Sequence, residues 1–223
     1  MKNIYLIVIL LLSSIYSISQ VKEASIALYA TPSDFVHNRK ANVKAIAIIK
    51  DESDQHLSLK SIIDSSSRKN IKKVFTAWGL EYNGNKYFNL QHSSDLFHPQ
   101  VFIKLDIVGR YSVAFIDDNS PKILRSREST YYGVGLAGAV TGVLVNESYK
   151  WNKNWFDKNG KQKKIIFIDN YEFNPKAIGS YLSRVQLKKL LPSTDFETRV
   201  KEIPFEEIVE IIKSHNELEA AQP

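Results

Sequence analysis

The stretch KVFTAWGLEYNGNKYFNL, residues 73–90, decides the fold class of this chain. Two runs rich in aromatic and β-branched residues flank the pair Asn83-Gly84. This pair is favoured in a type I′ turn, because both central residues of that turn need a positive φ. The stretch therefore predicts an antiparallel hairpin with Asn83-Gly84 at its tip and Trp78 near its middle.

Further strands are expected on both sides of this hairpin. Val43–Lys50 (VKAIAIIK) is apolar on both faces, which is typical of an interior strand. Val101–Asp117 alternates with a period of two, and Gly109 interrupts the pattern as a bulge or bend would. The other expectations are a strand over Val21–Ala30, a strand or helix over Leu57–Ile63, and a hairpin of Trp151–Phe156 with Lys161–Asp169.

Helix signals flank the strands and dominate the last fifty residues. Thr31 and Pro32 can cap and open a short helix. After Asn174-Pro175 an apolar stripe predicts a helix that continues to Leu191, and Pro204 opens a last helix. Strands first and helices last predict an α+β fold: a mainly antiparallel β-sheet over residues 22–169 followed by C-terminal helices. A capping box is expected at Thr194 and Glu197.

The first nineteen residues have the order of a secretory signal peptide. Lys2 is followed by the apolar run Ile4–Leu12 and then by small or polar residues, so cleavage is expected near Gln20. The alternative is a membrane anchor, but the run is shorter than the roughly 20 residues of a span. We expect a signal peptide over 1–19 and a single α+β domain over 20–223, with a Gly-rich apolar insert at 131–147.

Composition limits the setting and the partners. The chain has no cysteine, which argues against a disulfide framework and against a lipoprotein anchor. Thirty basic and 24 acidic residues give a formal charge of +6, and the basic residues lie in small groups. Such groups are typical of a solvated face and can also bind polyanions. For an exported, periplasmic or extracellular chain we expect an envelope polymer, a membrane surface or another protein as partner, and no nucleic acid.

Several short motifs also occur together in a known group of proteins. They are Ile26–Tyr29 followed by Ser33–Phe35 and Asn38, Ala77–Gly79 with Tyr87-Phe88, Ile107–Ser112, and Leu190-Leu191 with Asn216. In these motifs the chain resembles small exported bacterial proteins of unknown function. That group shares an IYxTxxDFxxN opening, a WGF…G…YF hairpin, a GRY strand and a closing helical region. Ala30 interrupts the opening motif here. The resemblance implies export and a β-rich fold, and no activity.

The segment Gly133–Gly138 spells G-x-G-x-x-G. The residues before it are polar and basic, whereas a dinucleotide site needs a buried strand there, so no cofactor is expected. Gly133–Val145 carries no charge, and Gly138 and Gly142 are spaced for close helix contact. The segment is expected to pack inside the domain or to contact a membrane or a second copy. The candidate contact residues are Gly133, Gly135, Gly138 and Gly142.

One loop offers metal ligands. His92, Asp95 and His98 have the spacing H-x2-D-x2-H, which would suit zinc, although an ordinary loop with exposed histidines explains it as well. Asp157–Gly160 resembles the start of a calcium loop without its later ligands, and a hairpin turn accounts for it. Acids expected on strands, which a glycosidase would need in pairs, are Glu81, Asp106 and Asp117.

No nucleophile motif is present, so no catalytic residue is assigned. The sequence favours an exported, non-catalytic binding or envelope-associated module. One alternative is a secreted hydrolase or metal-dependent enzyme that uses the His92–His98 loop. The other is a membrane-contacting protein that uses Gly133–Val145.

Overall fold

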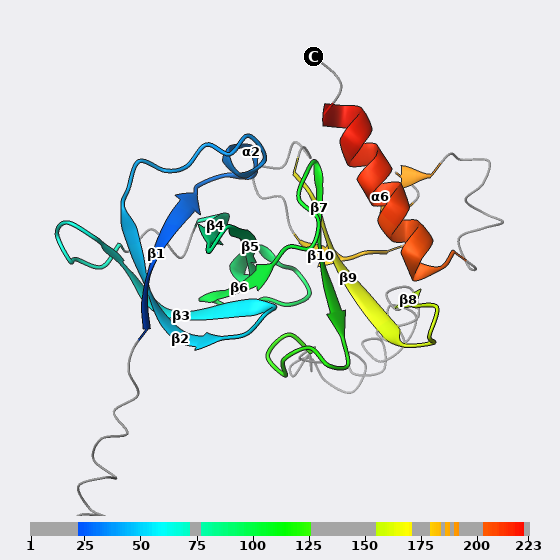
Figure 1. The fold of residues 1–223 in the computed structure, drawn as a ribbon, viewed down its shortest axis with the longest axis horizontal. Helices are drawn as coiled ribbons and strands as arrows, with labels where there is room; N and C mark the ends of the chain where they lie inside the picture. Colours follow the sequence, from blue (N-terminus) through cyan, green and yellow to red (C-terminus); the bar gives the residue numbers. More distant parts are fainter. Residues whose placement is uncertain are drawn as a thin grey trace, which may run out of the picture.

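The computed structural model describes residues 22–71, 77–125, 155–170, 179–183, 186–187, 190–191 and 203–220. In these ranges the chain forms three layers (Figure 1): a closed six-stranded barrel, a second antiparallel sheet, and a C-terminal helix. The second sheet lies between the barrel and the helix (Figure 1). The expected α+β class with a mainly antiparallel sheet is confirmed. Among the described helices, none combines the length and the apolar composition that a membrane-spanning helix needs.

The barrel closes because its first strand pairs with strands on both sides. Its order is β1-β2-β3-β6-β5-β4, and every neighbouring pair is antiparallel. A short helix, α2 (Pro32–Val36), follows β1, and a 3₁₀ turn (Leu90–His92) follows β5. The strands are β1 (Lys22–Tyr29), β2 (Ala45–Glu52), β3 (His56–Asp64), β4 (Gly79–Tyr82), β5 (Asn85–Asn89) and β6 (Val101–Lys104).

The Asn83-Gly84 hairpin is confirmed. Both residues have positive φ, 49° and 74°, and they join β4 to β5 with Tyr82 opposite Asn85. Trp78 directly precedes β4, so it lies at the open end of the described hairpin and not near its middle. Its carbonyl still accepts the Asn89 N–H at 3.1 Å, which extends the pairing by one step.

Alternate residues of the barrel strands point inward, as the two-residue period requires. In β2, Ala45, Ala47 and Ile49 are buried, whereas Ile46 and Ile48 are half-buried on the outer face. This strand lies between β1 and β3, as expected for an interior strand, but only one of its faces is fully buried. The interior also contains Ile26, Leu28, Leu57, Leu59, Ile62, Leu80, Tyr82, Tyr87 and Phe102.

The second sheet consists of β7 (Tyr111–Asp117), β9 (Gln162–Asp169), and the two short strands β8 (Trp155–Phe156) and β10 (Ser180–Tyr181). The expected interruption at Gly109 is confirmed: β6 ends at Lys104, and β7 begins at Tyr111. The interruption also moves the chain from the barrel to the second sheet. The described strands between residues 22 and 169 therefore belong to two sheets, whereas the sequence predicts one.

Strand β6 separates two hydrophobic cores. Phe102 points into the barrel, whereas Val101 and Ile103 join a second core between the barrel and the second sheet. All three side chains are buried, which explains why this strand is apolar on both faces. The second core also contains Tyr29, Phe35, Trp78, Phe88, Leu90, Leu105, Ala114, Ile116, Ile166 and Ile168.

The helix expected from Pro175 to Leu191 is wrong in its described first part. Ser180–Tyr181 form β10, which pairs with β9, and the described helical residues of this stretch are 186–187 and 190. Ser183 ends the extended segment with a capping box. Its Oγ accepts the Gln186 N–H at 3.4 Å, and Gln186 Oε1 accepts the Ser183 N–H at 2.8 Å. The apolar stripe therefore does not form one continuous helix, because its Tyr181 pairs with β9 as a strand residue.

The last helix, α6 (Phe205–Ala220), begins directly after Pro204 as expected. Ile208 and Ile212 are buried against the second sheet, and Phe205 packs edge-on against Phe115 with ring centroids 5.0 Å apart. The signal peptide over 1–19, the Thr194–Glu197 capping box and the Gly-rich segment with Gly133, Gly135, Gly138 and Gly142 lie outside the described residues.

Candidate functional site

A groove of about 580 Å³ lies between β1, β2 and the chain that follows α2. We call it the β1–β2 groove. Ser25 on β1 lies opposite Ile46 on β2, and both belong to the outward row of the two strands. Its lining consists of Glu23, Ala24, Ser25, Ile26, Ala27, Lys40, Ala41, Val43, Lys44, Ala45, Ile46 and Ser65.

Backbone hydrogen bonds hold the rim of the groove in place. The Ala41 N–H donates to the Leu28 carbonyl at 2.8 Å, which ties the segment after α2 to β1. The Ser65 N–H donates to the Lys44 carbonyl, also at 2.8 Å, which ties the turn after β3 to the start of β2. The groove is therefore bounded by backbone that the fold has already ordered.

The charges around the groove are unequally compensated. The Arg68 guanidinium donates two hydrogen bonds, of 2.8 and 3.1 Å, to the Glu23 carboxylate, and these bonds lower the pKa of Glu23. Lys40 pairs with Glu81 at 3.0 Å. Lys44 is exposed, and its ammonium group makes no ion pair within the described part of the chain. The groove thus has one acid already occupied and one uncompensated cation.

Glu81 connects the groove to the core between barrel and sheet. The buried Tyr29 hydroxyl donates to Glu81 Oε2 at 2.7 Å, and this bond together with Lys40 lowers the pKa of Glu81. Burial, followed by the same hydrogen bond, raises the pKa of Tyr29. Tyr29 is completely buried, so it cannot meet a substrate. Glu81 is therefore an anchor for Lys40 and Tyr29.

A serine, a histidine and an aspartate meet at the β2–β3 turn. Ser53 Oγ lies 2.6 Å from His56 Nδ1, and His56 Nε2 lies 3.2 Å from Asp51 Oδ2. In a hydrolase triad the serine faces Nε2 and the acid faces Nδ1, so the order here is reversed. Ser53 Oγ also accepts the N–H groups of Gln55 and His56, each at 3.2 Å. These contacts stabilise the β2–β3 turn, and they occupy the lone pairs of Ser53 Oγ that a nucleophile would need.

The three candidate zinc ligands do not come together. His92 Nε2 lies 3.2 Å from the Ala77 carbonyl, and His98 Nδ1 lies 3.1 Å from the Pro99 carbonyl. Asp95 Oδ2 accepts the Tyr181 N–H at 2.8 Å and so holds β10 in place. No three acidic or histidine side chains of the described ranges are arranged to hold a metal ion.

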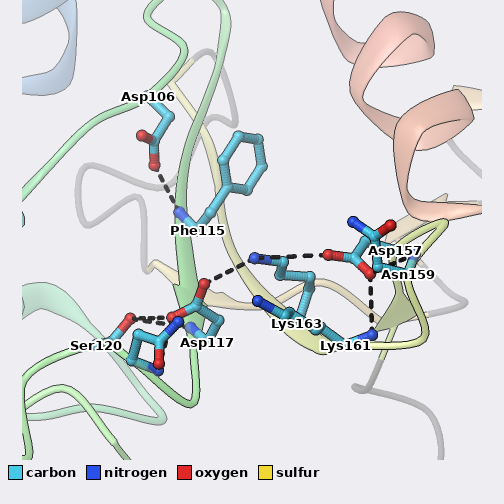
Figure 2. A network of polar contacts seen from close by, with 9 residues as sticks. Asp106, Phe115, Asp117, Ser120, Asp157, Asn159, Lys161 and Lys163 are labelled. Carbon is cyan, nitrogen blue, oxygen red and sulfur yellow. Dashed lines mark hydrogen bonds and ion pairs between the residues drawn. The ribbon is translucent and has the colours of Figure 1, made fainter.

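The remaining acids support the second sheet (Figure 2). Lys163 lies between two carboxylates, 2.7 Å from Asp117 and 3.9 Å from Asp157. The hydrogen bond from Lys163 lowers the pKa of Asp117. Asp157 Oδ1 also accepts the Lys161 N–H at 2.9 Å, which closes the β8–β9 turn that was compared with a calcium loop. Asp106 does not contact Lys163; its Oδ2 accepts the Phe115 N–H at 2.7 Å (Figure 2).

This Asp106 contact belongs to a series that protects the free edge of β7. Val113 exchanges backbone hydrogen bonds with Ile107, and Ser120 Oγ accepts the Asp117 N–H at 2.9 Å. At the start of β7, Asn216 from α6 accepts the Tyr111 N–H at 2.8 Å and donates to its carbonyl at 2.9 Å. Every second residue of the edge is thus satisfied, which prevents pairing with another chain.

The motif residues of the sequence resemblance have structural roles. Phe35 packs edge-on against Tyr29, with ring centroids 5.1 Å apart, and a Cβ on Gly79 would lie 3.2 Å from the Phe35 ring. A Cβ on Gly109 would lie 2.5 Å from Asn216 Cγ. Arg110 forms ion pairs with Asp169 and Glu219, which fasten α6 to the sheet. These motifs therefore describe how the fold is held together.

No protein-family model matches the chain, and no curated protein or solved structure resembles it significantly. Its function is therefore inferred from the candidate site alone. The sequence did not indicate the β1–β2 groove, because small residues such as Ser25, Ala27 and Ala41 carry no chemical signature. The outward alternation of Ser25 with Ile46 is the one signal from which part of the groove could have been expected.

Proposed function

We propose that the protein is an exported, non-catalytic binding module that takes its ligand in the β1–β2 groove. The proposal rests on a contrast: the groove is open to a ligand, whereas the clusters of histidine, serine and acidic side chains elsewhere in the described residues support the fold. Ser53, His92 and Asp117 each belong to a cluster whose polar atoms hold a turn, a loop or a strand. The groove offers volume, an apolar floor and an uncompensated lysine.

Its size supports this role. Sites for small molecules commonly enclose about 300–1,000 Å³ and combine an apolar lining with a few polar groups. The groove has about 580 Å³, aliphatic side chains such as Val43 and Ile46, and the hydroxyls of Ser25 and Ser65. A hydrolase would in addition need a base beside one of these hydroxyls, and the lining contains no histidine and no carboxylate other than Glu23, which Arg68 occupies.

Thermal unfolding with ligand panels tests the proposal. Peptides, envelope glycan fragments and amphiphiles would be added, since a ligand at 100 times its Kd stabilises the folded state by about 2.7 kcal/mol. We expect one class to raise the Tm of the wild type and to lose this effect in Ser25→Phe, which fills the groove. Lys60→Gln, on the exposed part of β3, is the control. Stabilisation that survives Ser25→Phe would contradict the proposal.

Catalysis is tested separately with chromogenic esters, amides and glycosides. We expect no turnover above background from the wild type. Turnover that disappears in Ser53→Ala or in His92→Ala would overturn the non-catalytic proposal and favour a hydrolase.

Export is tested by the intact mass of the protein recovered outside the cytoplasm, which should correspond to a chain that begins near Gln20. A mass that retains residues 1–19 would contradict cleavage.

A further inference from the structure

We propose that the β1–β2 groove binds a single-chain anionic amphiphile, in its simplest form an alkyl carboxylate, with the anionic head at Lys44. This inference rests on the proposed function and names the ligand class of the same site. Three features of the groove carry it: the aliphatic floor, the distribution of charge, and the size.

The floor of the groove suits an alkyl chain. Val43 and Ile46 are the larger apolar side chains of the lining, whereas those of Ile26 and Ala45 are buried in the barrel interior. No aromatic ring belongs to the lining. Flat ligands such as nucleobases are usually held by stacking on aromatic faces, which this site does not offer. Val43 is 40% exposed although it is a large apolar residue. An alkyl chain laid over Val43 and Ile46 would remove this surface from water.

The charge distribution selects an anion. Glu23 is the only acid in the lining, and Arg68 occupies both of its carboxylate oxygens. Lys40 has its own partner in Glu81. Lys44 therefore supplies the net positive charge, and the hydroxyls of Ser25 and Ser65 lie in the same groove as donors for a carboxylate. A cationic amphiphile would meet no free counter-charge there.

The size and position of the groove favour a free monomer over a bilayer. A volume of about 580 Å³ accommodates one small ligand, and the lining comes from β1, β2 and the two segments that border them. Membrane docking would instead require an exposed apolar face. The large exposed apolar residues of the described ranges, Val43, Phe97, Val108, Phe156 and Leu218, come from separate segments and only Val43 lies in the groove.

Calorimetric titration with octanoate, decanoate and dodecanoate, each below its micelle concentration, tests the inference. A fully buried methylene contributes about 0.8 kcal/mol, so affinity should rise by up to about fourfold for each added methylene. Lys44→Gln should weaken binding by about three- to fivefold and reduce its salt dependence. Lys50→Gln, an exposed lysine farther along β2 and outside the lining, should bind as the wild type does.

The groove-filling variants Ser25→Phe and Ser65→Phe should both abolish binding while they retain the wild-type far-UV circular dichroism. Two positions are used so that a folding defect in one leaves the other informative. A dodecyl trimethylammonium ion that binds as tightly as dodecanoate would overturn the inference. So would an affinity independent of chain length, or binding to anionic vesicles that exceeds binding of the monomer.

Failure of the inference and failure of the proposed function give different results. If the alkyl carboxylates do not bind but a peptide or glycan does, and Ser25→Phe abolishes that binding, the ligand class is wrong and the binding function stands. If ligands bind equally to the wild type and to both groove-filling variants, the groove is not the site and both proposals fail.

Discussion

Replacing Asn216 by alanine should loosen the attachment of α6 to the second sheet. The substitution removes both hydrogen bonds to the backbone of Tyr111, a residue that is only 6% exposed. Each such bond contributes about 1 kcal/mol net, and a buried group left unpaired costs a further 1–3 kcal/mol. Because Asn216 itself is half-exposed, water can reach part of the gap. We expect a loss of about 2–3 kcal/mol and, at this chain length, a Tm lower by about 4–12 °C.

Gly109 lies directly against the Asn216 side chain, so substitutions at the two positions should affect stability jointly. A Cβ at Gly109 would lie 2.5–2.7 Å from three atoms of the Asn216 side chain, so Gly109→Ala should destabilise the wild type. In the Asn216→Ala background the added methyl group has room. Urea unfolding of the two single variants and the double variant tests this. The stability lost in the double variant should be smaller than the sum of the two single losses by at least about 1 kcal/mol. Losses that add within about 0.5 kcal/mol would show that Gly109 and Asn216 are not coupled. Lys213→Ala on the exposed face of α6 is the control.

Three further predictions concern local structure. Gly84→Val places a β-branched residue at a φ of +74° and should lower the free energy of unfolding in urea by about 1–2 kcal/mol. The cost comes from the backbone, because a Cβ there would meet no atom within 4 Å. An unchanged midpoint would contradict the type I′ turn. The pKa of Asp117 is lower in the folded state than in the unfolded state, mainly because of its hydrogen bond from Lys163. This pairing therefore stabilises the fold fully above the unfolded-state pKa of about 4. The contribution is lost as the pH falls through the lower folded-state pKa. Asp117→Asn should thus be less stable than the wild type at pH 7, and the difference should shrink below pH 4; a constant difference would refute the ion pair. Ser53→Ala should lower stability by about 1 kcal/mol through loss of the turn contacts to His56, as measured by denaturation.

Local signals predicted the elements that local chemistry controls. Asn83-Gly84 determines its hairpin through its own backbone preferences, and Thr31 caps α2 by accepting the Asp34 N–H at 3.1 Å. Pro204 likewise marks the start of α6. In each case the residues that define the element lie within a few positions of one another, so the sequence alone contains the relevant interactions.

Features that depend on distant contacts were not predictable in the same way. Closure of the barrel requires β1 to pair with β4, with Leu28 opposite Leu80, and no local pattern specifies that pairing. Tyr181 was assigned to a helix because its apolar stripe fits one, whereas Asp95, far away in the chain, holds it in β10. The function of Gly109 likewise depends on Asn216 in α6.

The candidate site was still harder to predict. The loop with His92, Asp95 and His98 contains residues that can bind metals, yet the fold uses each of them for a separate contact. The β1–β2 groove is formed mainly by small side chains and backbone, which have no distinctive pattern in one sequence. Ligand sites made in this way become visible only when strands far apart in the chain are placed side by side.

Backbone amide chemical-shift mapping during a decanoate titration shows which residues contact the ligand. If the β1–β2 groove is the binding site, we expect concentration-dependent shifts that cluster on residues 23–27, 40–46 and Ser65, with little change around the His92–His98 loop or in the second sheet. Shifts centred on that loop, or on α6 and β7, would contradict the assignment of the groove as the binding site.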